Sequence, residues 1–304
     1  MSLSRTLVSA RCLAEALGSG APGSGAPGAG AEQPIRVLDT SWYLPGSGRD
    51  GRREHREAHI PGAGYFDLDE CCDRSSPYEH SLPEPEAFAA YAGGLGVSGG
   101  CRVVVYDGSP YGAFCSPRVW WMFRLFGHRA VSVLDGGLAA WRRLGLPLES
   151  GHASPRPRAF TASYTPSAVT AFPAVVSNIH RPRFQLLDAR SRGRFRGIEP
   201  EPREGFEPGH IPGSINIPFT TFLDPETLLM RDVASLRAIF EEHHVDLSKP
   251  IVATCGTGVT ACHIALAAYL CGKEDVAIYD GSWVEWFTRA KPENIISEGK
   301  GKLK

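Results

Sequence analysis

Short runs of apolar, mostly β-branched residues alternate along this chain with longer segments in which apolar residues recur every three or four positions. The short runs have the length and composition of buried strands, and the longer segments have the period of helices. The predicted strands include residues 37–39, 103–106, 187–188 and 250–254, and the predicted helices include residues 88–95, 118–126, 234–243 and 261–271. Strands that alternate with helices predict an α/β fold with mainly parallel sheets flanked by helices.

The same pattern occurs twice. A strand ending in aspartate, a His-Ile-Pro-Gly turn, a strand followed by a glycine-containing loop, and an Asp-Gly pair followed by tryptophan recur in the same order. The paired positions are 39 and 188, 59 and 210, 107 and 255, and 135 and 280. Their nearly constant offset predicts two homologous tandem domains at residues 31–150 and 180–295. The proline-rich residues 151–166 predict a linker or hinge between them.

Composition limits the possible functions. The 304 residues carry 32 Lys and Arg against 33 Asp and Glu, so we expect no nucleic-acid partner and no role at a membrane surface. No apolar run is long enough to span a bilayer. The eight cysteines form no C-x-x-C pair and no Cys/His cluster with zinc spacing. We therefore predict free thiols, no metal site and no cofactor.

The N-terminal segment fits two interpretations. Arg5 and Arg11, among serines and small apolar residues, resemble a weak mitochondrial presequence. The spacing of Leu13 and Leu17 fits the first helix of a folded domain equally well. Residues 18–30 consist almost wholly of Gly, Ala, Pro and Ser, which predicts a flexible surface loop.

Cys255 is the candidate nucleophile. It opens the loop Cys-Gly-Thr-Gly-Val-Thr, between the predicted strand 250–254 and the predicted helix 261–271. Backbone N–H groups and the positive end of a helix dipole are therefore expected around one sulfur atom, where they favour the reactive thiolate. Many cysteines are instead small buried core residues. The flanking glycines and the strand-to-helix switch favour chemistry at this one.

The repeat predicts a single active site, in the second domain. The first copy carries Asp107 where the second carries Cys255, and a carboxylate cannot act as a sulfur nucleophile. Ligand sites in parallel sheets lie at the carboxyl ends of strands and often between domains, so we expect the first domain to form a wall of the pocket. His59 and His210 occur in both copies, and we therefore assign them to the fold.

Together these motifs resemble the rhodanese family of sulfurtransferases. The two His-Ile-Pro-Gly turns, the cysteine loop and the segments 41–45, 117–121, 193–197 and 280–283 carry the resemblance, which covers about residues 7–300. It is particularly close to the branch of the family that uses 3-mercaptopyruvate. The resemblance implies two rhodanese-like domains and a cysteine that takes sulfur from a donor, becomes a persulfide and passes the sulfur to a thiol or to cyanide.

The cysteine loop indicates the donor. By resemblance, thiosulfate-using members carry two basic residues directly after the cysteine, whereas Gly256 and Thr257 are neutral, as in members that use 3-mercaptopyruvate. Fewer cations attract a dianion less strongly. A 2-oxo acid needs an arginine fork for its carboxylate, and the resemblance assigns Arg194 and Arg203 to the substrate carboxylate and carbonyl. Arg190 follows a strand directly, so we expect it to pair with a nearby glutamate.

The resemblance further implies an acid–histidine–hydroxyl relay of Asp69, His80 and Thr257. Many mercaptopyruvate-using members have serine in place of Thr257, and threonine keeps the Oγ atom but adds a methyl group that stiffens χ1. The loop is expected to bind the substrate and hold the persulfide. Its expected binding residues are Gly256, Gly258, Val259 and Thr260.

Products and partners also follow from the resemblance. It implies pyruvate and eventually hydrogen sulfide as products, thioredoxin as a thiol acceptor, and a monomer that forms a disulfide-linked homodimer when oxidised, in the cytoplasm and the mitochondrion. A thiosulfate:cyanide sulfurtransferase remains an alternative. So does a redox-sensing, sulfur-binding protein, which the remaining cysteines suggest. A C-x5-R cysteine phosphatase is excluded because Ala261 stands where its arginine would be.

Overall fold

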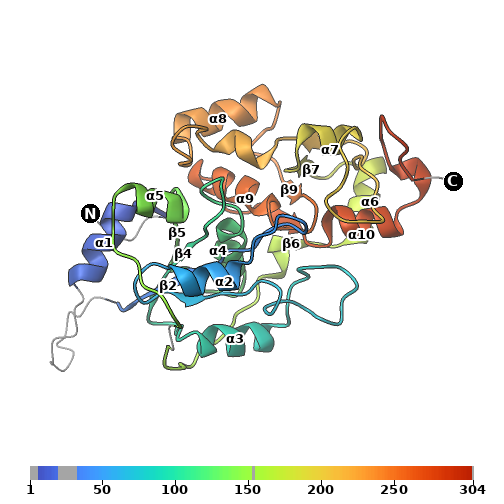
Figure 1. The fold of residues 1–304 in the computed structure, drawn as a ribbon. Helices are drawn as coiled ribbons and strands as arrows, with labels where there is room; N and C mark the ends of the chain where they lie inside the picture. The colour runs from blue at the N-terminus through green and yellow to red at the C-terminus, as the bar shows by residue number, and fades with distance from the viewer. Residues whose placement is uncertain (1–5, 20–32, 153–154, 303–304) are drawn as a thin grey trace.

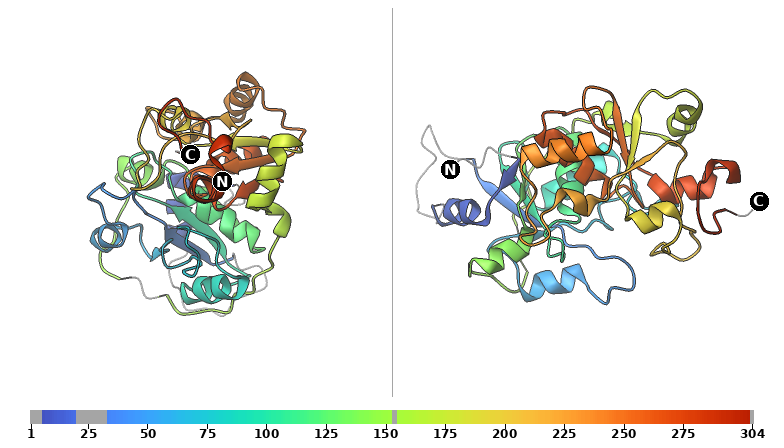
Figure 2. Two further views of the ribbon diagram at one scale, coloured as in Figure 1. Left: turned by 90° about the vertical axis from the view of Figure 1, so that its right-hand side faces the viewer. Right: turned by 90° about the horizontal axis from the view of Figure 1, so that it is seen from above.

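The computed structural model describes residues 6–19, 33–152 and 155–302. Within these ranges each half of the chain forms one five-stranded sheet, and all strand pairs inside both sheets are parallel (Figure 1). Helix α1 (Ala10–Ser19) and the last described residues lie at opposite ends of the molecule (Figure 2). The predicted fold class, two α/β domains in tandem, is confirmed.

The first sheet has the strand order β1-β5-β4-β2-β3. Its strands are β1 (Leu7–Val8), β2 (Ile35–Asp39), β3 (Gly64–Tyr65), β4 (Arg102–Tyr106) and β5 (Val131–Leu134). Its further helices are α2 (Gly51–Glu57), α3 (Pro85–Gly94), α4 (Ser116–Leu125) and α5 (Gly137–Arg143). Asp39 pairs in register with Tyr106, so the loops that begin at residues 40 and 107 leave the sheet at the same edge.

The second sheet repeats this arrangement with the order β6-β10-β9-β7-β8. Its strands are β6 (Val169–Thr170), β7 (Gln185–Asp188), β8 (Ile215–Asn216), β9 (Ile251–Thr254) and β10 (Ala277–Tyr279). Its helices are α6 (Phe172–His180), α7 (Arg192–Arg196), α8 (Val233–Glu242), α9 (Ala261–Leu270) and α10 (Ser282–Arg289), with short 3-10 turns at Pro166–Ala168, Phe219–Phe222 and Pro292–Asn294. Asp188 lies opposite Thr254.

Neighbours β7 and β9 form the point at which the chain reverses its direction of travel across the second sheet. From β7 the chain first adds β8 on one side and later adds β9 on the other. Open parallel sheets bind ligands at the carboxyl ends of strands at such a switch point. Cys255 follows the last residue of β9 directly, so the fold places the predicted nucleophile at this edge.

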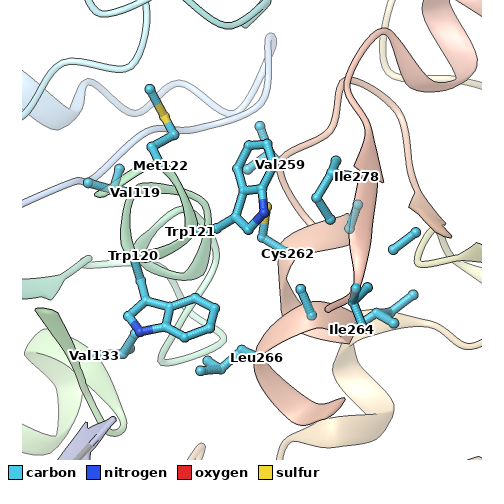
Figure 3. Close-up of a cluster of buried hydrophobic side chains, with 14 of the residues drawn as sticks. Val119, Trp120, Trp121, Met122, Val133, Val259, Cys262, Ile264, Leu266 and Ile278 are labelled. Carbon is cyan, nitrogen blue, oxygen red and sulfur yellow. The ribbon is translucent and has the colours of Figure 1, made fainter. Parts of the chain in front are cut away.

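Helices α4 and α9 join the two domains. Figure 3 shows Trp120 and Trp121 of α4 directed toward α9, where Cys262 and Leu266 face them. Trp120 also meets Tyr269 of α9 edge to face, with ring centroids 5.4 Å apart. The buried residues of this contact belong to one apolar cluster that reaches into both sheets. Such a shared core fixes the position of one domain against the other.

Both predicted domain starts, residues 31 and 180, need correction, because β1 and β6 lie before them. Each of these strands has two residues, too few to show a period in the sequence. Val8 and Leu13 are buried in the first-domain core, which favours a folded helix for this part of the N-terminal segment. Most of the predicted loop at residues 18–30 lies outside the described residues.

The predicted linker runs along the first domain. Its described residues up to 165 form no helix or strand. The backbone N–H of Arg158 donates to the carbonyl of Gly93 at 2.9 Å, and the N–H of Thr165 donates to Leu125 at 3.0 Å. These bonds hold the crossing segment against the first domain.

Candidate active site

The loop at residues 255–260 is positioned by buried elements on both sides. All four residues of β9 are buried, and so are Ala261 to Ala268 at the start of α9. Cys255 is 2% exposed and lines a cavity of about 220 Å³. The cavity lies between the domains, because the first contributes Trp42, Leu44, Tyr111 and Phe114 and the second contributes the loop, α7 and Phe219.

Hydrogen bonds fix the backbone at Cys255 and leave the N–H groups of the following loop residues without partners in the described chain. The N–H of Cys255 donates to the Oγ of Ser282 at 3.2 Å, and its carbonyl accepts from the N–H of Trp283 at 3.0 Å. Over the described residues, no hydrogen bond involves the backbone N–H groups from Gly256 to Thr260. Together with Cys255, the cavity is lined by Gly256, Thr257, Val259 and Thr260. Consecutive open N–H groups in such a loop are suited to a bound anion.

In the first domain, Asp107 occupies the position that corresponds to Cys255. The carboxylate of Asp107 accepts hydrogen bonds from the N–H groups of Phe114, Cys115 and Ser116, at 2.8 to 3.0 Å. The donors at the start of α4 are therefore satisfied within the protein. In the first copy these three N–H groups are occupied, whereas those from Gly256 to Thr260 in the second copy are open within the described chain.

Two arginines lie at the cavity, and each has a carboxylate partner. Arg194 of α7 donates to Glu201 through Nη2 at 2.5 Å and through Nε at 3.1 Å. Arg203 donates from Nε to Glu79 of the first domain at 2.6 Å. The Nη1 atoms of Arg194 and Arg203 form no hydrogen bond within the described chain. They remain open for a ligand.

Arg190 fixes the position of Glu201, the carboxylate that pairs with Arg194. Its guanidinium is buried and bonds to Asp188 at 2.6 Å and to Glu201 at 2.8 Å, which confirms the predicted pairing with a nearby glutamate. It also lies over the ring of Trp283 at 4.3 Å. Burial alone would raise the pKa of Glu201, but the charges of Arg190 and Arg194 bring that pKa below its ordinary value. Glu201 therefore stays ionised and anchors Arg194.

The three residues of the predicted relay lie in one hydrogen-bonded chain. His80 Nδ1 is 2.9 Å from Thr257 Oγ1, and His80 Nε2 is 3.1 Å from Asp69 Oδ1. The hydrogen bond to His80 lowers the pKa of Asp69. A carboxylate next to Nε2 places the ring proton there, so Nδ1 of neutral His80 accepts from the threonine hydroxyl.

A buried arginine that the sequence motifs contain, but to which we assigned no role, organises this contact between the domains. Arg118 of α4 is fully buried and donates to the carbonyl of His80 at 2.8 Å, to Asp280 at 2.7 Å and to the carbonyl of Gly258 at 3.3 Å. It thereby connects the relay histidine to the cysteine loop. A charged residue inside the apolar run Ser-Pro-Arg-Val-Trp-Trp was the signal for a buried partner.

Most of the cysteines, and the two histidines of the repeated turn, contribute to the fold. Of the eight cysteines seven are buried, and Cys72 is partly exposed. Burial raises the pKa of Cys71 and of Cys262, so these thiols resist ionisation. His59 and His210 each direct Nδ1 to a backbone carbonyl. The described residues hold no group of side chains suited to a metal ion and no helix that could cross a membrane.

Known proteins share this architecture along almost the whole chain. The rhodanese-like domain family matches residues 47–144 and 173–289. The 3-mercaptopyruvate sulfurtransferase of Homo sapiens is 58% identical over 300 residues, which are 99% of this chain and 98% of the relative. The thiosulfate sulfurtransferase of Bos taurus is 52% identical over 98% of this chain and 97% of the relative.

A solved structure agrees with these relatives. The crystal structure of SseA from Escherichia coli, described as a 3-mercaptopyruvate sulfotransferase with the rhodanese fold, has a TM-score of 0.79 and 35% identity to this chain. The match covers 91% of this chain and 98% of that protein. The chain therefore belongs to the rhodanese family of sulfurtransferases.

Proposed function

We propose that this sulfurtransferase takes its sulfur from 3-mercaptopyruvate. The observation that carries the proposal is the position of Arg194: a Cβ atom at Gly256 would lie 3.1 Å from its Nη2 atom and 3.9 Å from Nη1 of Arg203. The absent side chain leaves room for a guanidinium from α7 beside the cysteine. The loop itself carries no cation, and an arginine fork suits the carboxylate of a 2-oxo acid.

Charge balance at the cavity supports a monoanionic donor. Each of the two arginines is already paired with a glutamate, Glu201 or Glu79. The net positive charge at the cavity is therefore small, and a ligand would be bound mainly through directed N–H groups. A dianion such as thiosulfate would gain less from such a site than from two unpaired cations directly beside the cysteine.

The first half-reaction forms a persulfide on Cys255. The thiolate attacks the sulfur of 3-mercaptopyruvate, a sulfur–sulfur bond forms, and the carbon–sulfur bond breaks. The electron pair of that bond leaves as the enolate of pyruvate. The proton of the donor thiol, now on the outer sulfur, is transferred to the enolate carbon, so that the products are a persulfide anion and pyruvate.

The relay is suited to moving this proton. Thr257 directly follows Gly256 in the loop and is 5% exposed at the cavity wall. Its hydroxyl donates to His80, which in turn is bonded to the ionised Asp69. We infer that His80, supported by Asp69, takes up the proton from the outer sulfur through the Thr257 hydroxyl and returns it to the enolate carbon. This role is typical of a histidine with a carboxylate partner.

The second half-reaction returns the cysteine to its thiolate. The five open N–H groups from Gly256 to Thr260 stabilise the persulfide anion until a thiolate acceptor attacks its outer sulfur. This attack transfers the outer sulfur to the acceptor, which then carries a persulfide. With a dithiol acceptor such as thioredoxin, the second thiolate attacks the inner sulfur of that persulfide. A disulfide forms in the acceptor, and hydrogen sulfide leaves.

A comparison of sulfur donors tests the proposal. We expect the purified protein to show a kcat/KM for 3-mercaptopyruvate at least about tenfold above that for thiosulfate, a difference of roughly 1.4 kcal/mol in transition-state binding. The double variant Gly256→Arg with Thr257→Lys places two cations in the loop and displaces Arg194. It should shift the ratio toward thiosulfate. Faster turnover of thiosulfate by the unaltered protein would favour the alternative donor.

A further inference from the structure

The indole of Trp42 holds the acidic end of the relay. Its Nε1 atom lies 3.1 Å from Oδ1 and 3.0 Å from Oδ2 of Asp69. One N–H group therefore faces both oxygens of the carboxylate. Trp42 comes from the segment that follows β2, a part of the first domain 27 positions away from Asp69 in the sequence.

Asp69 needs such a partner because it lies in an open position. Its side chain is 64% exposed. Within the described chain its carboxylate has two side-chain partners, Nε2 of His80 and Nε1 of Trp42. An exposed aspartate held at one oxygen alone can rotate about two bonds. The second donor removes that freedom and favours the ionised form.

The same ring also fixes the histidine. The indole and the imidazole of His80 meet edge to face, with centroids 4.7 Å apart and planes at 89°. Trp42 also lies parallel to Phe114, with ring centroids 6.4 Å apart and planes at 6°. Phe114 in turn packs against Phe219 of the second domain. The indole therefore contacts both Phe114 of the cavity wall and His80 of the relay.

We propose that Trp42 is a positioning residue for the relay of Asp69, His80 and Thr257. Its N–H keeps Asp69 oriented toward His80, so that Nε2 holds its proton and Nδ1 accepts from Thr257. This inference rests on the proposed reaction at Cys255. The charged or titratable groups that interact electrostatically with Asp69 include His80, Arg203, Cys72 and Cys115, so its ionisation depends on them as well as on the indole.

The variant Trp42→Phe distinguishes the effect of the N–H donor from the effect of the aromatic ring. Phenylalanine keeps an aromatic face against His80 and Phe114 but cannot donate. We expect kcat with 3-mercaptopyruvate to fall about threefold to tenfold, the scale of one ordinary hydrogen bond, because the Asp69 carboxylate is exposed to water, with KM changed less than twofold. The acid limb of the kcat profile should move to higher pH, because Asp69 loses a donor that favours its carboxylate.

Trp141→Phe is the matched control. Trp141 lies in α5 of the same domain, and its Nε1 donates to the carbonyl of Pro147 at 2.8 Å, away from the cavity. This control removes an equivalent N–H group from the first domain. It should lower the melting temperature at least as much as Trp42→Phe does, and it should leave kcat and the pH profile unchanged.

A double-mutant cycle with Asp69→Asn decides how Trp42 acts. If it acts through the carboxylate, Trp42→Phe changes kcat less than twofold in the Asp69→Asn background. An equal fall in both backgrounds, or a kcat and pH profile of Trp42→Phe equal to those of the unaltered protein, would overturn the inference. Mass measurement of the Cys255 persulfide is the check on the reaction itself: its absence in the unaltered protein would reject the proposed function, and its presence leaves the cycle to judge Trp42 alone.

Discussion

His80 and Thr257 are 177 positions apart in the sequence, yet Nδ1 of the histidine lies 2.9 Å from the hydroxyl of the threonine. His80 belongs to the first domain and Thr257 to the cysteine loop of the second. The domain that lacks the nucleophilic cysteine thus supplies two of the three relay groups, Asp69 and His80. The site is complete only when both domains pack through α4 and α9.

The relay predicts a difference between two replacements of Thr257. Thr257→Val keeps the branched shape and removes the hydroxyl, so we expect kcat with 3-mercaptopyruvate to fall by about a hundredfold, the usual scale for lost acid–base assistance. Thr257→Ser keeps the Oγ atom and should retain kcat within about threefold. Steady-state kinetics of the pair is the measurement. A valine variant as fast as the serine variant would show that the hydroxyl has no part in the reaction.

The arginine fork predicts an effect on substrate binding. Arg194→Lys keeps the charge but loses the planar fork that bonds Glu201 through Nε and Nη2 and leaves Nη1 for a substrate carboxylate, so KM for 3-mercaptopyruvate should rise about tenfold. Arg192→Lys, on the exposed face of the same helix, is the control and should leave KM unchanged. If KM stayed constant in both variants, Arg194 would not bind the substrate.

The ion pairs of Glu201 are expected to contribute to the free energy of unfolding in a pH-dependent way. Its folded-state pKa is depressed, so its stabilising effect is fully present above its unfolded pKa of about 4.3 and is lost as pH falls through the folded value. Glu201→Gln should therefore lower the free energy of unfolding by about 3 kcal/mol at pH 7, because Arg190 loses a buried partner. The difference between the two proteins should shrink below about pH 4.

Denaturant unfolding at several pH values measures this difference. Glu298→Gln, which removes an exposed partner of Arg196, is the control and should change the free energy of unfolding by less than about 1 kcal/mol at any pH. A difference for Glu201→Gln that grows on acidification would contradict the assignment.

The first-domain loop predicts that a cysteine there is not sufficient for activity. Asp107→Cys removes the carboxylate that satisfies three N–H groups at the start of α4. We expect about 2 kcal/mol of destabilisation in denaturant unfolding and no persulfide at residue 107 after exposure to 3-mercaptopyruvate. A second persulfide at that position would show that the N–H groups freed at the start of α4 make a cysteine reactive without the arginines and the relay found at Cys255.

Much of the fold could be predicted because it is local and occurs twice. The runs before Asp107 and Cys255 gave strands that the structure shows as β4 and β9, and the helix from Ala261 is α9. The strand order could not be predicted from these runs, since pairing is a long-range property. β1 and β6 were missed because two residues carry no period.

The candidate site could be predicted less completely. Cys255 is marked by its own loop, but Glu79, which pairs with Arg203, lies 124 positions away in the first domain, and nothing in the spacing identifies it as a partner. The contacts of Trp42 and Arg118 also cross between segments far apart in the sequence. A pattern along the chain shows which residues are unusual. It does not show which of them meet.

The most direct test of the account is the mass of the peptide that contains Cys255 after the protein is exposed to 3-mercaptopyruvate without an acceptor. We predict a gain of one sulfur atom on that peptide, reversed by a thiol acceptor and absent in Cys255→Ser. A protein that releases pyruvate while this peptide stays unmodified, or whose sulfur is found on another cysteine, would contradict the central claim.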